Sequence, residues 1–187
     1  MNVLHLDPKE SLVLVVDVQE RLFSAMPELS GNDLLRSGTA LLEGASLLGV
    51  AAVVTEQYPE KLGRTLGPLS ERLEAMSAPR FSKLDFSACR DAAVDAWLAK
   101  SDRRQAIVIG METHICVFQT VRDLCARGFK VHVPLDGVAS RRDDHRAAGL
   151  DLCRAAGATI TTTETILFDW LGRAGTDAFR KISKLIK

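Results

Sequence analysis

Three residues of types used in nucleophilic catalysis stand at or near the ends of apolar runs. Asp17 lies in LVLVVDV, Lys83 in RFSKLDFS and Cys116 in IGMETHICVFQT. Cysteine is a poor helix former without capping value, so its place at the start of a helical stretch favours a chemical role. Together an acid, an amine and a thiol suit amide hydrolysis: the carboxylate accepts the thiol proton, the ammonium stabilises the thiolate, and the thiolate attacks a carbonyl carbon.

Each of these residues also has a structural interpretation. Asp17 is suited to capping a helix, and a lone lysine on a loop is usually solvated. Cys116 could be a small buried hydrophobe, as we expect of the other three cysteines. No cysteine pair is spaced as CxxC and no histidine stands at zinc-ligand spacing, so we expect free thiols and no structural zinc.

The elements that must position these residues follow an α/β pattern. Continuous runs of β-branched and apolar residues, typical of strands buried on both faces of a parallel sheet, occupy residues 12–18, 50–56, 105–110, 130–135 and 158–163. Helical spacing marks residues 33–48, 88–100, 113–127 and 142–156. The long connection 57–86 is expected to carry minor elements, with a weak third strand near residues 80–82. Ligands of such sheets bind beyond the carboxyl ends of the strands, so the three residues should share one edge.

The composition is that of an ordinary globular protein. The chain has 187 residues, 47% of them hydrophobic, and 24 Lys and Arg against 24 Asp and Glu. We expect one domain over residues 1–187, a small-molecule substrate, and no electrostatic attraction to nucleic acid or an anionic membrane. The apolar runs are too short to span a bilayer, and the N-terminus lacks a secretory signal, which favours a cytoplasmic location.

Taken together, the motifs VVDVQ, KLDFS and GMETHICV resemble those of the isochorismatase-like cysteine hydrolases. VTEQYPEKLGRTL, VHVPLDGVASR and FRKISKLIK are most similar to the branch called isochorismatase domain-containing proteins. The resemblance implies a three-layer Rossmann-like fold with a six-stranded parallel sheet in the order 3-2-1-4-5-6. It implies a catalytic triad of Asp17, Lys83 and Cys116, a cis peptide bond at Met111–Glu112, an oxyanion hole formed by the N–H groups of Glu112 and Cys116, and a homo-oligomer.

Departures from the family narrow the expected chemistry. Nicotinamidases hold a metal with Asp and His residues between the second and third strands, whereas here no histidine lies between His5 and His114. We therefore expect no metal or other cofactor, and nicotinamide is disfavoured. Retention of the cysteine and lysine favours C–N bond hydrolysis over the enol-ether chemistry of isochorismatase. That chemistry stays open as an alternative, as does a non-catalytic, redox-responsive oligomer.

The expected substrate-binding residues lie near the strand ends and in the turn before the cysteine: Gln19, Glu56, Gln57, Tyr58, Phe86 and His114. Each of them has an alternative role in capping or packing. Of the other histidines, His132 is interpreted as a core residue and His145 as a polar contact at a helix start.

Overall fold

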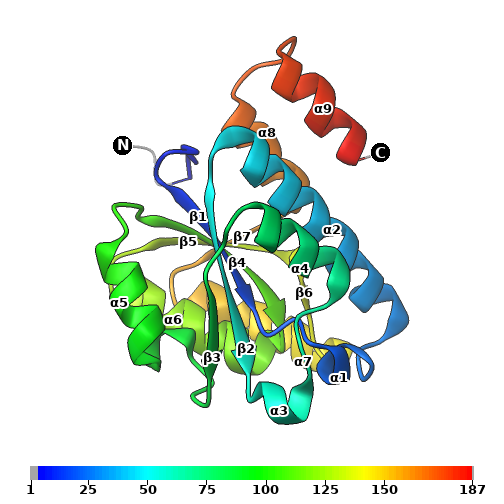
Figure 1. Ribbon diagram of the computed structural model, residues 1–187, viewed down its shortest axis with the longest axis vertical. Coiled ribbons are helices and arrows are strands. Elements are labelled where there is room, and N and C mark those ends of the chain that lie inside the picture. Colours follow the sequence, from blue (N-terminus) through cyan, green and yellow to red (C-terminus); the bar gives the residue numbers. More distant parts are fainter. Residues whose placement is uncertain (1–3, 187) are drawn as a thin grey trace.

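A parallel β-sheet forms the centre of the protein. The computed structural model describes residues 4–186 (Figure 1). The strands are β1 (Ser11–Val16), β2 (Ala51–Gln57), β3 (Arg80–Lys83), β4 (Gln105–Met111), β5 (Lys130–Pro134), β6 (Val138–Ala139) and β7 (Thr159–Thr161). Their order is β3-β2-β1-β4-β5-β7, with β6 paired to β4. The predicted α/β class and strand order are confirmed along the main path. The two-residue β6 is an addition, because so short a strand leaves no periodic pattern in the sequence.

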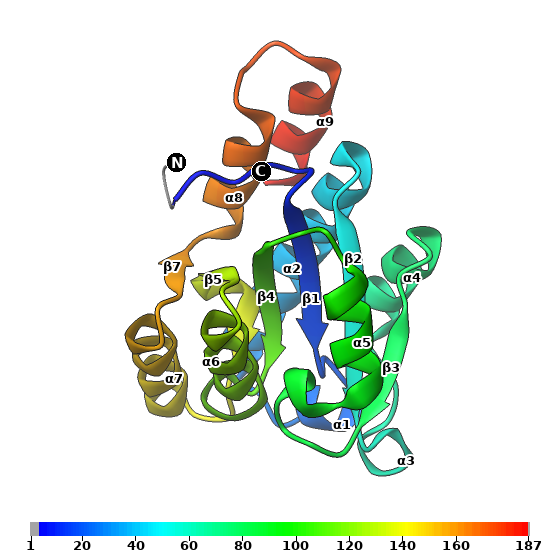
Figure 2. The ribbon, with the colours of Figure 1, turned by 90° about the vertical axis from the view of Figure 1, so that its left-hand side faces the viewer.

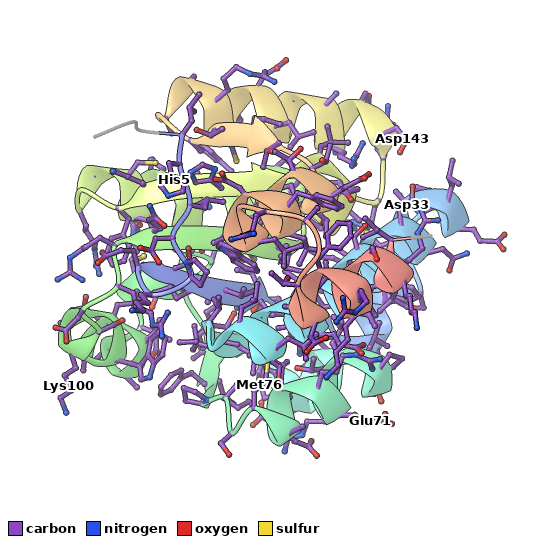
Figure 3. The ribbon with its side chains drawn as sticks, turned by 90° about the horizontal axis from the view of Figure 1, so that it is seen from above. His5, Asp33, Glu71, Met76, Lys100 and Asp143 are labelled. Carbon is purple, nitrogen blue, oxygen red and sulfur yellow. The ribbon has the colours of Figure 1, made fainter. Side chains whose placement is uncertain are left out.

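Helices cover both faces of the sheet (Figures 1 and 2). The α-helices are α1 (Glu20–Phe23), α2 (Glu28–Leu48), α3 (Pro59–Leu62), α4 (Gly67–Ala75), α5 (Ala92–Lys100), α6 (Phe118–Ala126), α7 (Asp143–Ala155), α8 (Thr163–Leu171) and α9 (Asp177–Leu185). Single turns of other helix types are η1 (Ala88–Arg90), η2 (Thr113–Val117) and η3 (Leu135–Gly137). Seen from above, Glu71 of α4 and Lys100 of α5 lie on opposite sides of the sheet (Figure 3).

The continuous apolar runs are explained by two separate cores. Successive side chains of a strand point to opposite faces. Val13 and Val15 therefore pack with α2, α4, α8 and α9, while Leu12 and Leu14 pack with α5, α6 and α7. Full burial of each such side chain contributes about 1.5–3 kcal/mol. A strand buried on both faces has no polar side to show in its sequence.

Glycine is required where β4 passes the end of β1. Gly110 has φ +135°, and a Cβ there would lie 2.0 Å from the carbonyl oxygen of Val16. The close approach brings the turn after β4 beside Asp17, the residue that follows β1.

Among residues 4–186, no helix is long and apolar enough to cross a membrane.

Candidate active site

Asp17, Lys83 and Cys116 come together at the carboxyl edge of the sheet. The Lys83 Nζ lies 2.7 Å from Asp17 Oδ2, and both side chains are fully buried. The other oxygen of Asp17, Oδ1, accepts a hydrogen bond of 2.8 Å from the Thr55 hydroxyl. The same carboxylate also acts on the Cys116 thiol, whose pKa it raises. One carboxylate therefore acts on both the amine and the thiol.

Burial of Cys116 decides the state of its thiol. The residue is 6% exposed, and burial followed by the negative charge of Asp17 raises the pKa of the thiol to about 12, against the opposing effect of Lys83. The resting residue is therefore a protonated thiol, whereas the sequence had suggested a thiolate stabilised by the lysine. A reaction at this sulfur needs a base to remove the proton during attack, and Asp17 is in place to do so.

The turn between β4 and Cys116 has an unusual backbone. The peptide bond between Met111 and Glu112 is cis, at the position implied by the resemblance. It leads into η2, a single π-helical turn in which the Val117 N–H donates to the Glu112 carbonyl. Cys116 is thus held near the end of this turn rather than on a regular α-helix.

Two side chains of this turn contact the segment before α7. Glu112 Oε2 accepts hydrogen bonds of 3.0 Å from the backbone N–H and the Nε of Arg141. Burial alone would raise the pKa of the Glu112 carboxyl, but the Arg141 bonds hold it below its ordinary value. His114 Nδ1 lies 3.0 Å from the Ser140 hydroxyl, and its ring lies 4.7 Å from that of His145. Burial lowers the His114 pKa against the opposing charge of Glu112, and it favours the neutral ring.

The last three residues of β2 point in two directions. Glu56 is buried and accepts hydrogen bonds from Thr65, Arg64 and Arg80. On the other face, Thr55 and Gln57 contact Asp17 and Lys83 respectively. The polar groups of Glu56 are thus engaged within the protein, on the face away from the triad.

Gln19 is likewise occupied by the fold. Its amide bonds the backbone N–H and carbonyl of Gln57 at 2.7 and 3.0 Å, and the carbonyl of Gly63 at 2.7 Å. The buried Gln19 therefore ties the end of β2 to the loop before α4, and its role in substrate binding stays a prediction.

A pocket adjoins Lys83. It has a volume of about 520 Å³ and is lined in part by Tyr58, Lys83, Leu84 and Asp85. Tyr58 lines this pocket and is 44% exposed, whereas Phe86, which is 53% exposed, is not among its lining residues. The role of the two residues as walls of a substrate site stays a prediction.

Two residues that contact the site, Thr55 and Arg141, were not among the predicted site residues. Thr55 was not predicted as a site residue, although its position two residues before Gln57 places both on one face of β2. No sequence pattern indicated Arg141 as a site residue, because its contact with Glu112 depends on how the β6–α7 segment crosses the end of β4. The predicted core position of His132 agrees with its 3% exposure.

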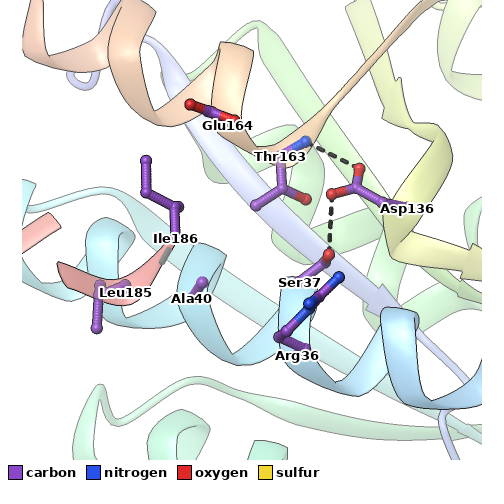
Figure 4. Close-up of a pocket in the computed structure, with 8 residues that line it drawn as sticks. All are labelled: Arg36, Ser37, Ala40, Asp136, Thr163, Glu164, Leu185 and Ile186. Atoms are coloured by element: carbon purple, nitrogen blue, oxygen red, sulfur yellow. Dashed lines mark hydrogen bonds between the residues drawn. The ribbon is translucent and has the colours of Figure 1, made fainter. Parts of the chain in front are cut away.

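A second pocket lies away from this edge. It has a volume of about 170 Å³ and is lined by residues of α2, η3, α8 and α9 (Figure 4). There Asp136 accepts hydrogen bonds from the Ser37 hydroxyl at 2.8 Å and the Thr163 N–H at 2.9 Å. These bonds join helices α2 and α8 to η3. Within residues 4–186, no three His, Cys, Asp or Glu side chains are grouped as metal ligands would be.

Comparison with known proteins defines the family. The model of the isochorismatase domain matches residues 11–165, which include Asp17, Lys83 and Cys116. The chain belongs to the isochorismatase-like hydrolase family. It is 36% identical to the secreted isochorismatase effector Isc1 of Phytophthora sojae over 96% of this chain and 86% of that protein.

Two further relatives span nearly all of this chain. Isochorismatase domain-containing protein 1 of Salmo salar is 34% identical over 98% of this chain, which covers 63% of that protein's length. A solved structure described as the MAR1 ribonuclease of Caenorhabditis elegans superposes with a TM-score of 0.90 and 34% identity, covering 97% of this chain and 92% of that one. The fold is therefore shared along the chain, whereas the names of these relatives describe different activities.

Proposed function

We propose that the protein is a cysteine hydrolase that cleaves an amide-type C–N bond of a small molecule through a thioester on Cys116. The observation that carries the proposal is the buried carboxylate of Asp17, which pairs with the Lys83 ammonium and whose charge acts on the Cys116 thiol. A base, a charge partner and a nucleophile are the groups that this reaction requires.

The first half-reaction transfers one proton and forms one covalent bond. Asp17 takes the proton of Cys116 as the sulfur attacks the substrate carbonyl carbon, and the carbonyl oxygen becomes an oxyanion. Backbone N–H groups of Glu112 and Cys116 are proposed to stabilise that oxyanion. The protonated Asp17 then donates its proton to the leaving nitrogen, the C–N bond breaks, and the acyl group remains on sulfur.

The second half-reaction returns the protein to its starting state. Asp17 removes a proton from water, the hydroxyl oxygen attacks the thioester carbonyl, and the C–S bond breaks. The proton on Asp17 passes to the departing sulfur, which restores the thiol. Lys83 supplies positive charge beside Asp17 throughout and exchanges no proton.

The names of the relatives point to two other substrate classes, whose hydrolysis is measured separately from amide turnover. Isc1 is named an isochorismatase, and an enol ether could be hydrolysed without the cysteine. The nematode protein is described as a ribonuclease, so RNA belongs in the panel although this chain has no net charge. A non-catalytic, redox-responsive oligomer in the cytoplasm remains the alternative outside enzymes.

The test is release of ammonia or amine from a panel of small amides and carbamoyl compounds, with Cys116→Ser as the key variant. Cys125→Ser is the matched control, since Cys125 is a partly buried thiol on α6. We expect amide turnover in the wild type and Cys125→Ser, loss of about 10³-fold or more in Cys116→Ser, and an acyl adduct on Cys116 by mass spectrometry after acid quenching.

Other outcomes would replace the proposal. Hydrolysis of an isochorismate-like enol ether that survives Cys116→Ala would favour the isochorismatase-type reaction. Absence of any turnover together with reversible oxidation of Cys116 would favour the non-catalytic alternative.

A further inference from the structure

The Lys83 ammonium has more acceptors around it than protons. Its Nζ lies 2.7 Å from Asp17 Oδ2, 2.6 Å from Gln57 Oε1, and 3.1 and 3.2 Å from the carbonyl oxygens of Asp85 and Phe86. An ammonium has three N–H donors. All three are therefore engaged within the protein, and the shortest contact is with the neutral amide of Gln57.

Gln57 is itself held in one orientation. It is the register partner of Lys83 in the parallel pair of β2 and β3. Its Nε2 donates to the Leu84 carbonyl at 2.7 Å, so rotation of the amide would place its NH₂ against the ammonium and its oxygen against that carbonyl. The backbone of Gln57 is fixed by Gln19, whose amide bonds both its N–H and its carbonyl.

We propose that Gln57 is a positioning residue, whose amide oxygen holds the Lys83 ammonium against Asp17 and withholds it from the substrate. The inference rests on the proposed function in so far as Lys83 serves catalysis, and it gives Gln57 a role different from the substrate contact expected from the sequence. Lys83 then acts through its charge alone and donates no hydrogen bond to substrate.

The placement of this charge bears on the nucleophile. The charged groups that act on Cys116 are Asp17 from the end of β1, Lys83 from β3 and Glu112 from the turn after β4. Lys83 is the cation among them and opposes the effect of the two carboxylates. Without the Gln57 acceptor, the ammonium is less firmly held beside Asp17, and the thiolate of Cys116 becomes harder to form.

The experiment measures alkylation of Cys116 by iodoacetamide from pH 7 to pH 10, resolved by mass spectrometry. Gln57→Met keeps the side-chain length without an acceptor, and Gln57→Asn keeps the amide but is one methylene too short to reach Lys83. We expect each to slow alkylation about three- to tenfold at a given pH and to shift the profile upward, since a pKa change of one unit changes the thiolate fraction about tenfold.

Two controls separate positioning from general structural damage. Gln105 is also a buried glutamine, with hydrogen bonds to Asp7, Ser11 and the His5 carbonyl at the opposite end of the sheet. Gln105→Met should destabilise the protein without moving the Cys116 profile. In a Lys83→Met background, adding Gln57→Met should change the alkylation rate less than about twofold, because the residue acts through the lysine.

The inference is overturned if the Gln57 variants alkylate like the wild type, if Gln105→Met shifts the profile equally, or if Gln57→Met keeps its full effect without Lys83. Alkylation needs no substrate, so it judges Gln57 even if no amide is hydrolysed. Absence of turnover in the wild type would instead count against the proposed function.

Discussion

A methyl group at Gly149 has no room, and the clash falls on the turn that carries Cys116. A Cβ on this residue of α7 would lie 2.7 Å from the backbone nitrogen of His114, 2.8 Å from the carbonyl carbon of Thr113 and 2.9 Å from the His114 Cα. Optimal contacts between carbon atoms lie at about 3.5–4.0 Å. All three neighbours are backbone atoms, so in Gly149→Ala either η2 or α7 must move by roughly 1 Å.

The expected cost falls more on reactivity than on stability. Overpacking costs about 1–3 kcal/mol, while alanine gains about 1 kcal/mol over glycine in a helix, so the net loss of unfolding free energy should be about 0–2 kcal/mol. A displacement of about 1 Å at a reacting group can reduce the rate by about 10²-fold. Gly149→Ala should therefore lose most of its turnover of an amide substrate while remaining largely folded.

The assay pairs urea unfolding with amide turnover and site-resolved alkylation of Cys116. Gly67→Ala is the matched control, because Gly67 lies in α4 and a Cβ there meets nothing within 4 Å. Turnover, Cys116 alkylation and stability all at wild-type values in Gly149→Ala would refute the idea that close contact with α7 fixes the turn.

Three further predictions concern the charges around the site. Lys83→Met should lower the unfolding free energy in urea by about 3–5 kcal/mol, because Asp17 is left buried and uncompensated, and adding Asp17→Asn should recover part of that loss. Because burial and Asp17 raise the Cys116 pKa to about 12, its alkylation rate should rise about tenfold per pH unit from pH 7 to 10; a plateau near pH 8.5 would contradict this. Because the Glu112 pKa is lowered by folding, its ionised carboxylate stabilises the protein at pH values above the ordinary carboxyl pKa. This stabilisation is lost as the pH falls through the pKa that Glu112 has in the folded protein. The melting temperature should therefore fall less between pH 7 and pH 3 in Glu112→Gln than in the wild type. Equal decreases would show that the Glu112–Arg141 ion pair does not contribute to the acid sensitivity of the protein.

Much of the fold could be predicted because a strand buried on both faces appears in the sequence as a continuous run of mostly apolar residues. The runs at β1, β2 and β4 are mostly apolar. The glycine that ends α2, Gly49, has the left-handed conformation typical of a helix end, with φ +70°. Element boundaries were less accurate. The strand predicted to reach residue 163 ends at Thr161, since the Thr162 side chain caps α8, a helix that the threonine-rich pattern did not indicate.

For the candidate site, the sequence could predict which strand ends meet at one edge of the sheet, but not which side chains face one another there. The edge brings Asp17, Lys83 and Cys116 together, but the consecutive residues Thr55, Glu56 and Gln57 alternate between faces, and sequence alone does not say which face meets the triad. Register decides this. Because Gln57 is paired with Lys83, its side chain and that of Thr55 reach Lys83 and Asp17, while Glu56 reaches Arg80 on the other side.

The resting chemistry of Cys116 bears on the alternatives that remain for this chain. Redox-sensing cysteines are typically accessible and have a low pKa, so that they are thiolates before an oxidant arrives. Cys116 is 6% exposed, and its pKa is raised to about 12. Its proton can leave for Asp17 when negative charge develops on a substrate oxygen, because the transition state then gains stabilisation that the free thiolate lacks. The buried, protonated thiol of Cys116 thus lacks the properties typical of a redox sensor, which favours the proposed hydrolase over the non-catalytic alternative.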